Sequence, residues 1–195
     1  MDQHDDWNLL ALGALNAAHL SWWLSLLNGE AWLRRLFWMD AGYIVLDAAW
    51  LVFSPSCVAP RVWQTLCFHH LSVLACVPVA IGRPLLMSHF LRTWIVELSS
   101  WTHIAARRLK GTRVAALLER LNKPIYVGLR MIGFPLTYVV YARERAASPA
   151  LLLQSPTHLH VPLSAMHFVL YGLMLKWGWG MLRPARAPAT PPKSE

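Results

Sequence analysis

Long runs of apolar residues, separated by short polar stretches, alternate along this chain. An apolar run of about twenty residues is long enough for a helix to cross the hydrocarbon core of a bilayer. Residues that favour turns separate the first four runs: Asn28-Gly29, Ser54-Pro55 with Pro60, and Gly82-Arg83-Pro84. The pattern predicts six membrane-spanning helices, at about residues 7–27, 36–53, 62–81, 86–105, 125–141 and 160–182. The predicted fold class is therefore all-α, a polytopic bundle of six transmembrane helices.

We expect one transmembrane domain, residues 7–182, because a chain of 195 residues with spans along its length has no room for a second one. Residues 1–6 are acidic and are predicted to form a short N-terminal tail. Residues 183–195 are rich in proline and alanine, which predicts a disordered C-terminal tail. Lysine and arginine are more frequent in the connections on the side of the N-terminus, which favours both termini in the cytosol.

Composition agrees with a membrane protein. Hydrophobic residues make up 56% of the chain and charged residues 14%, with a mean hydropathy of +0.37, whereas a soluble domain carries roughly 25% charged residues. The net charge of +8 could indicate a nucleic-acid ligand. However, the positive charge lies in connections beside the spans, where it sets orientation and meets anionic lipid headgroups. We therefore expect membrane lipids as partners and no nucleic acid.

Two adjacent histidines, His69 and His70, lie in the middle of the third apolar run. A titratable side chain costs free energy in hydrocarbon, so it usually faces the protein interior and often marks a functional site. At helical spacing, His69 shares one small, polar face with Thr65, Ser72 and Cys76. We therefore expect His69 to line a cavity and His70 to lie at its edge.

Acidic and basic residues in neighbouring spans could complete a polar site. Glu97 could orient a histidine or accept its proton, but it could equally form a structural ion pair with Arg92. Asp47 could pair with Arg130 or with a histidine. In a purely structural reading, the histidines are only packed and hydrogen-bonded. Pro135, one turn beyond Arg130, should kink its helix and free a backbone carbonyl.

Four short motifs occur in order along the spans. They are Gly42-Tyr43 followed by Asp47, the pair His69-His70, the stretch Glu97-Leu98-Ser99-Ser100, and Leu121-Asn122 leading to Arg130 and Pro135. In this order they resemble the TLC family, a six-span domain shared by translocon-associated TRAM proteins, ceramide synthases and small TLC-domain-containing proteins of lipid metabolism. The resemblance covers about residues 10–182. It is closer to the small TLC-domain-containing proteins, because residues 92–100 lack the aspartate pair of the ceramide-synthase signature.

The resemblance implies a protein of lipid metabolism or lipid homeostasis in the endoplasmic reticulum or another internal membrane. It also implies acyl lipids, with acyl-CoA as a candidate donor, and an acyltransferase reaction is one candidate activity. In that reaction His69 or His70 would act as base or as nucleophile. The candidate catalytic residues are Asp47, His69, His70 and Glu97, and the candidate substrate-binding residues are Tyr43, Ser100 and Arg130. We expect no metal and no cofactor, because the three cysteines have no metal-ligand spacing.

Two other functions remain open on the sequence alone. The protein could be a membrane chaperone, cargo receptor or translocon-associated factor, in which case residues 107–123 and the tail would bind partners. It could also hold a haem, because helical bundles in membranes ligate haem through histidines. Adjacent histidines on one helix point about 100° apart, so only one of the pair could ligate a given iron.

Overall fold

A computed structural model describes residues 2–24, 29–147, 149–154 and 156–182. All regular structure in these residues is helical, as the apolar pattern predicts. The helices are α1 (Asp2–Trp23), α2 (Glu30–Phe53), α3 (Pro60–Ala80), α4 (Pro84–Thr93), α5 (Glu97–Arg108), α6 (Arg113–Tyr126), α7 (Phe134–Ala147), α8 (Pro149–Gln154) and α9 (Thr157–Leu182). Two short 3₁₀ turns, Pro55–Cys57 and Trp94–Val96, and a π-helical segment, Val127–Gly133, complete them. The predicted tail 183–195 lies outside the described residues.

Within the described part of the chain, four helical stretches are long and apolar enough to cross a membrane. They are Glu30–Phe53, Val62–Ala80, Arg113–Ala147 and Thr157–Gly180. The first and fourth predicted spans are also helical, as α1 and as α4 with α5, but they do not reach the same combination of length and hydropathy. These helices carry ionisable side chains, among them Asp5 on α1, Arg92 on α4 and Glu97 on α5.

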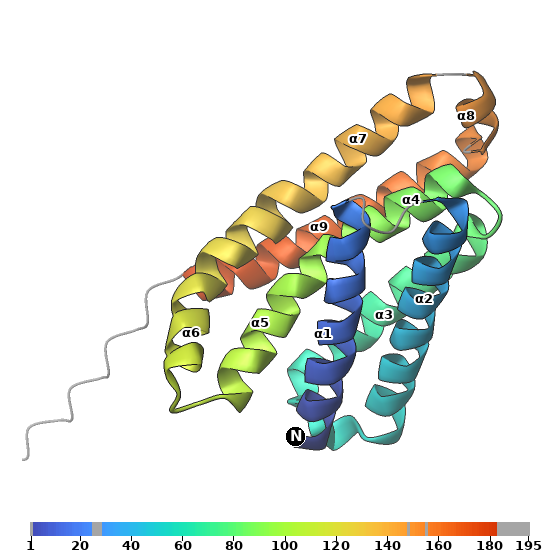
Figure 1. The fold of residues 1–195 in the computed structure, drawn as a ribbon. Helices are drawn as coiled ribbons and strands as arrows, with labels where there is room; N and C mark the ends of the chain where they lie inside the picture. The colour runs from blue at the N-terminus through green and yellow to red at the C-terminus, as the bar shows by residue number, and fades with distance from the viewer. Residues whose placement is uncertain (1, 25–28, 148, 155, 183–195) are drawn as a thin grey trace, which may run out of the picture.

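The helices pack as a bundle of long rods (Figure 1). Helix α1 packs against α2 and α5, while α2 also packs against α3 and α4, and α7 lies on α4. The N-terminus, the α2–α3 connection and the α5–α6 turn lie at the same end of the bundle (Figure 1). The predicted tight turn before Pro84 is confirmed, because Gly82 adopts a φ of 73°, which favours glycine, and α3 and α4 pack together.

Several helices extend further than the apolar runs. Helix α1 begins at Asp2, so residues 2–6, which we assigned to a tail, form its first turns. Most of the predicted basic connection 107–123 is helical, because α6 begins at Arg113, where Thr112 caps its first turn. Helix α7 continues to Ala147. A charged segment can continue a helix beyond its apolar run, so apolar runs underestimate helix length.

The π-helical segment Val127–Gly133 lies directly before Pro135. Proline has no N–H, so the carbonyl four residues earlier, that of Met131, loses its usual helical donor. The hydroxyl of Tyr171 on α9 donates to this carbonyl over 3.0 Å. The predicted free carbonyl is therefore confirmed, and a side chain from a neighbouring helix satisfies it.

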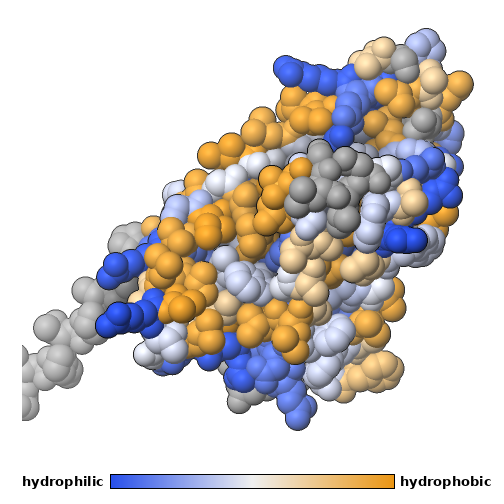
Figure 2. Space-filling view, in the orientation of Figure 1, coloured by the Kyte–Doolittle hydropathy of each residue, from blue (hydrophilic) through white to orange (hydrophobic). Residues whose placement is uncertain are grey.

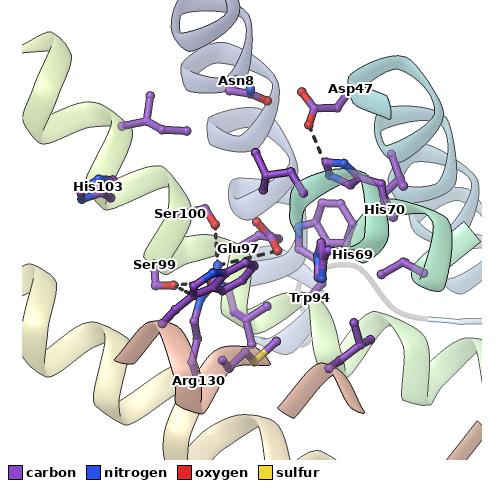
Figure 3. A pocket seen from close by; sticks show the side chains of 18 of the residues that line it. Asn8, Asp47, His69, His70, Trp94, Glu97, Ser99, Ser100, His103 and Arg130 are labelled. Atoms are coloured by element: carbon purple, nitrogen blue, oxygen red, sulfur yellow. Dashed lines mark hydrogen bonds and ion pairs between the residues drawn. The ribbon is translucent and has the colours of Figure 1, made fainter. Parts of the chain in front are cut away.

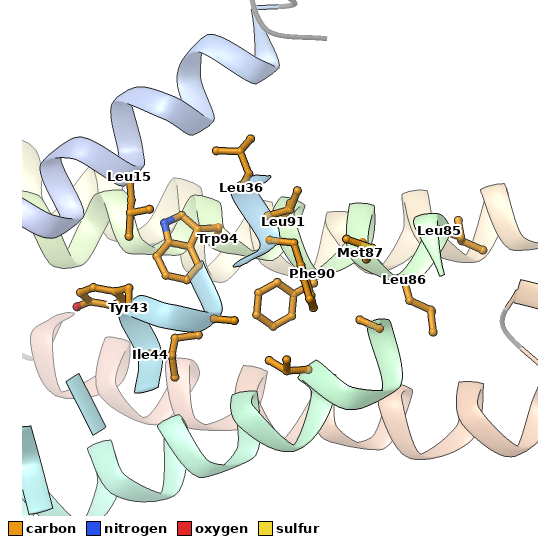
Figure 4. Packing of buried hydrophobic residues seen from close by; sticks show 14 of the residues in the cluster. Leu15, Leu36, Tyr43, Ile44, Leu85, Leu86, Met87, Phe90, Leu91 and Trp94 are labelled. Atoms are coloured by element: carbon orange, nitrogen blue, oxygen red, sulfur yellow. The ribbon is translucent and has the colours of Figure 1, made fainter. Parts of the chain in front are cut away.

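The main apolar core lies between α1, α2, α3 and α4 (Figure 4). Leu36, Phe37 and Leu91 are fully buried, and the ring of Phe37 meets that of Phe90 edge-on at 5.1 Å. On the outside, many large apolar side chains are exposed, such as Phe53 at 85%. Figure 2 shows apolar residues over much of the visible face, with the most hydrophilic ones gathered towards its ends. This surface suits lipid as the surrounding solvent.

Candidate functional site

Helices α4 and α5, joined by the turn Trp94–Val96, form one continuous rod, and α6 and α7, joined by the π-helical segment Val127–Gly133, form another. A cavity of about 490 Å³ lies inside the bundle, between α1, α2, α3, α9 and these two rods. We call it the main cavity (Figure 3). All seven candidate site residues of the sequence analysis line it: Tyr43, Asp47, His69, His70, Glu97, Ser100 and Arg130. Side chains from separate helices therefore converge on one internal space, as the cost of burying ionisable groups predicts.

Asp47 on α2 is almost fully buried and binds two histidines. His4 Nε2 lies 2.8 Å from Oδ1, and His70 Nε2 lies 3.3 Å from Oδ2. Asn8 lies beside His4, and its side-chain oxygen accepts a hydrogen bond from the hydroxyl of Tyr43. Of the two partners that we considered for Asp47, the structure selects histidine and not Arg130.

The two adjacent histidines have different surroundings. His70 Nε2 lies at ion-pair distance from Asp47, so the carboxylate favours a proton on Nε2, and Nδ1 of the neutral ring then carries the lone pair. That atom is buried and has no partner among the described residues. Among those residues His69 has no carboxylate within ion-pair distance, and its ring lies 5.5 Å from that of His70 and 6.3 Å from that of Trp177.

The expected placement of this pair needs a correction. Both histidines line the main cavity, and His70 is the more buried of the two, instead of lying at the edge. Beyond His69 the predicted polar face does not line the cavity, and two of its groups are satisfied within the helix. Ser72 donates to the Phe68 carbonyl over 2.7 Å, and Cys76 donates to the Ser72 carbonyl over 3.4 Å.

Arg130 extends into the main cavity from the π-helical segment and is 6% exposed. Its Nε donates to Ser99 Oγ and one terminal nitrogen donates to Ser100 Oγ, both over 2.6 Å. The same nitrogen lies 4.0 Å from Glu97 Oε1, too far for a hydrogen bond. The guanidinium also lies over the ring of Tyr126. Its direct partners are thus neutral hydroxyls, and the charge is compensated only at a distance.

The alternative pairing of Glu97 with Arg92 is wrong. Arg92 binds Glu144 on α7 instead, through two parallel hydrogen bonds of 2.5 and 2.8 Å. The reason is that the α4 end of the rod packs against α7, so the Arg92 side chain points away from the main cavity. Glu97, which begins α5, lines the cavity near Arg130.

A second buried acid–histidine pair lies outside the main cavity. Asp40 is fully buried, and His19 Nε2 lies 2.9 and 3.0 Å from its two carboxylate oxygens. The His19 ring stacks on Trp94, with centroids 5.6 Å apart and planes 7° apart. Since Trp94 lines the main cavity, this pair helps to hold one of its walls.

Helix α1 contributes to the site in a way that we did not predict from the sequence: its residues His4, Asp5 and Asn8 line the main cavity. We took the acidic start of the chain for a tail, but Asp5 pairs with Arg107 over 2.9 Å and so attaches α1 to the end of α5. A signal was present, because the buried positions of α1 follow helical spacing back to the N-terminus. These positions are His4, Asn8, Leu12, Leu15 and His19.

The chemistry that these residues can perform themselves is acid–base chemistry beside an apolar space. Asp47 and His70 form a carboxylate–imidazole pair with one free nitrogen, and Arg130 supplies positive charge in the same cavity. Among the described residues, no group of three or more His, Cys, Asp or Glu side chains is placed to hold a metal ion.

Comparisons of this chain with protein-family models, with curated proteins and with solved structures gave no match. Its function therefore has to be argued from the four motifs and from the geometry of the main cavity.

Proposed function

We propose that this chain is a six-span membrane protein of the TLC type that binds an acyl lipid in the main cavity and transfers its acyl group. The observation that carries the proposal is the convergence of Asp47, His70 and Arg130 on one buried, largely apolar space. In this proposal α1 and the α4–α5 rod are the two further spans, and they hold their ionisable residues on the inside of the bundle. The endoplasmic reticulum, or another internal membrane, is the proposed location.

The lining of the main cavity suits an amphiphile. Apolar side chains form much of the wall, including Leu66, Val73 and Leu170, and each lipid methylene buried there would contribute about 0.8 kcal/mol. Arg130 has only hydroxyl groups as direct partners, so its guanidinium can bind a carbonyl or an acidic group of a lipid. The polar end of the lipid would then lie near Ser100, and its chain would lie along the apolar wall.

His70 is the proposed general base. Its Nδ1 would take the proton from the hydroxyl or amine of an acceptor lipid as that group attacks the acyl carbonyl carbon. Asp47, whose carboxylate lies 3.3 Å from Nε2, would favour the tautomer with a proton on that nitrogen and stabilise the imidazolium that forms. The bond to the leaving group then breaks, and the imidazolium returns the proton to it. The motifs point equally to His69 and His70, and the contact with Asp47 favours His70.

The test uses the purified full-length chain in lipid nanodiscs. Native mass spectrometry would identify bound lipid, and a radiolabelled acyl-CoA with extracted membrane lipids would report transfer. We expect His70→Ala to slow transfer by about 10²- to 10⁴-fold, because it removes the general base. Asp47→Asn leaves the base in place but removes the charge that stabilises its imidazolium, so it should slow transfer as well. His158→Ala, at an exposed position on α9, is the matched control and should be fully active.

Two results would separate the parts of the proposal. If His70→Ala leaves transfer unchanged, the catalytic role of the Asp47–His70 pair is refuted. If the wild-type protein holds lipid but transfers nothing, the cavity serves a lipid carrier or sensor, and the non-enzymatic function replaces the enzymatic one.

A further inference from the structure

A smaller cavity of about 70 Å³ lies beside the main one, between α3, α4, α7 and α9. We call it the second cavity. At about 30 Å³ per water molecule in the liquid, its volume suits one or two water molecules or a small polar group. Five side chains line both cavities, so the two are neighbours: Val73, Phe90, Thr93, Phe134 and Leu170. None of the proposed catalytic residues lines the second cavity.

Two histidines from different helices line the second cavity, and each has an unsatisfied ring nitrogen. Nδ1 of His89 on α4 and Nε2 of His167 on α9 are both buried, and neither has a hydrogen-bond partner among the described residues. The ring centroids are 5.5 Å apart. An unsatisfied polar atom inside a protein is unusual and normally indicates a ligand or a water molecule.

Neither ring can readily turn to find another partner. His89 stacks on Tyr141, with centroids 4.5 Å apart, and His167 stacks on Phe134 at 4.1 Å. Each imidazole also interacts through a hydrogen bond with the backbone, His89 with Thr137 and His167 with Phe134. A neutral imidazole has one N–H, so a ring that donates to the backbone keeps its other nitrogen as an acceptor.

The lining offers these two acceptors no donor of its own. The Thr93 hydroxyl donates to the Phe90 carbonyl over 2.6 Å, and the Cys76 thiol donates to the Ser72 carbonyl. The residues that line the second cavity include no Asp, Glu, Lys or Arg, so a charged ligand would find no counter-charge there. The missing partner is therefore a neutral hydrogen-bond donor.

We infer that the second cavity is a binding site for a neutral O–H donor that hydrogen-bonds to His89, to His167 or to both. Two sources can supply it: a water molecule, which has two O–H donors, or a hydroxyl on a lipid that enters from the main cavity past Phe90 and Phe134. The lipid source rests on the proposed function, whereas the water source does not. A water molecule can donate to both histidines at once, whereas a lipid hydroxyl, with its single O–H, donates to one of them at a time.

The first experiment tests whether the two acceptors are satisfied, by thermal unfolding of the purified full-length protein. We expect His89→Phe and His167→Phe each to lower the unfolding midpoint by at least about 3 °C, because the donor loses a partner. The double variant should lose less than the sum, since no acceptor is then left. His158→Phe, an exposed histidine on α9, is the control. His167→Gln keeps an acceptor and should remain close to the wild type.

The second experiment identifies the source of the O–H group. Palmitate and 16-hydroxypalmitate differ only in a hydroxyl at the end of the chain, and their affinities can be compared by native mass spectrometry. If a lipid hydroxyl occupies the site, we expect about tenfold tighter binding of the hydroxylated acid to the wild type, and no preference in the double variant His89→Phe/His167→Phe, which has neither acceptor. Destabilised Phe variants without any such preference in the wild type identify water as the occupant.

Two outcomes would overturn the inference. The acceptors have no ligand if the Phe variants are as stable as His158→Phe. The ring packing, and not the acceptor, is what matters if His167→Gln is destabilised as much as His167→Phe. Neither outcome depends on acyl transfer, so failure of this inference and failure of the proposed function can be told apart.

Discussion

Removal of His19 should destabilise the protein more than removal of its partner, Asp40. Both side chains are buried, with 2% and 0% exposure, and the two carboxylate oxygens lie within 3.0 Å of His19 Nε2. His19→Leu leaves an acid buried without its partner, which costs about 3–5 kcal/mol. Asp40→Leu leaves an imidazole that can stay neutral, so the cost is that of one unsatisfied polar group, about 1–3 kcal/mol.

The measurement is a double-mutant cycle on the free energy of unfolding of the purified protein, followed by tryptophan fluorescence during denaturation in SDS. Because the double variant contains neither polar group, it should cost clearly less than the sum of the single variants. The control is the exposed pair Glu30–Arg34 on α2, whose side chains are 57% and 61% exposed. Arg34→Ala should cost less than about 0.5 kcal/mol. The reasoning is refuted if His19→Leu costs no more than Arg34→Ala.

Three further outcomes follow from individual contacts. A Cβ atom added at Gly178 would lie 2.9 Å from the ring of Tyr126, so Gly178→Ala should cost about 1–3 kcal/mol of unfolding free energy. The control, Gly180→Ala, has open space around the added Cβ and should cost nothing. Arg107→Ala breaks a partly exposed ion pair with Asp5 and should lower the free energy of unfolding by less than about 1 kcal/mol. Because salt screens the pair, the loss should be smaller at high salt, which unfolding curves at two salt concentrations would show. Burial raises the pKa of the Cys57 thiol, so its reaction with a maleimide should be slow at pH 7. The reaction should accelerate as the pH rises and the thiolate forms, and equal rates at pH 7 and pH 9 would contradict this.

The sequence predicts the contents of the main cavity better than the pairings inside it. Tyr43 and Asp47 are four residues apart on one helix, so they share a face, and the cost of a charge in hydrocarbon turns that face inwards. This argument identifies side chains that must avoid lipid. It does not identify their partners, because those depend on how the helices cross. Thus Arg92 lies five residues before Glu97 but binds Glu144, which belongs to another rod.

The start of α1 could not be placed for a different reason. Its acidic residues have no apolar pattern, and their partners lie about a hundred positions away along the chain, where Arg107 and Arg108 end α5. Ion pairs of such sequence separation leave no periodic signal. The wrong assignment of the start of α1 affected the predicted site, because His4 and Asn8 belong to the network around Asp47.

The π-helical segment Val127–Gly133 also determines the direction in which Arg130 points. A π-helical turn holds one residue more than an α-helical turn, and one residue corresponds to a rotation of about 100° around the helix axis. Deletion of a single residue from this segment would rotate α6 relative to α7 by that angle. If the residue is removed before Arg130 and α6 keeps its place, the guanidinium would turn by that angle away from Ser99 and Ser100, although every α-helix could keep its length and composition. A family of such proteins could therefore gain or lose the cationic group of the cavity by an insertion or a deletion of one codon.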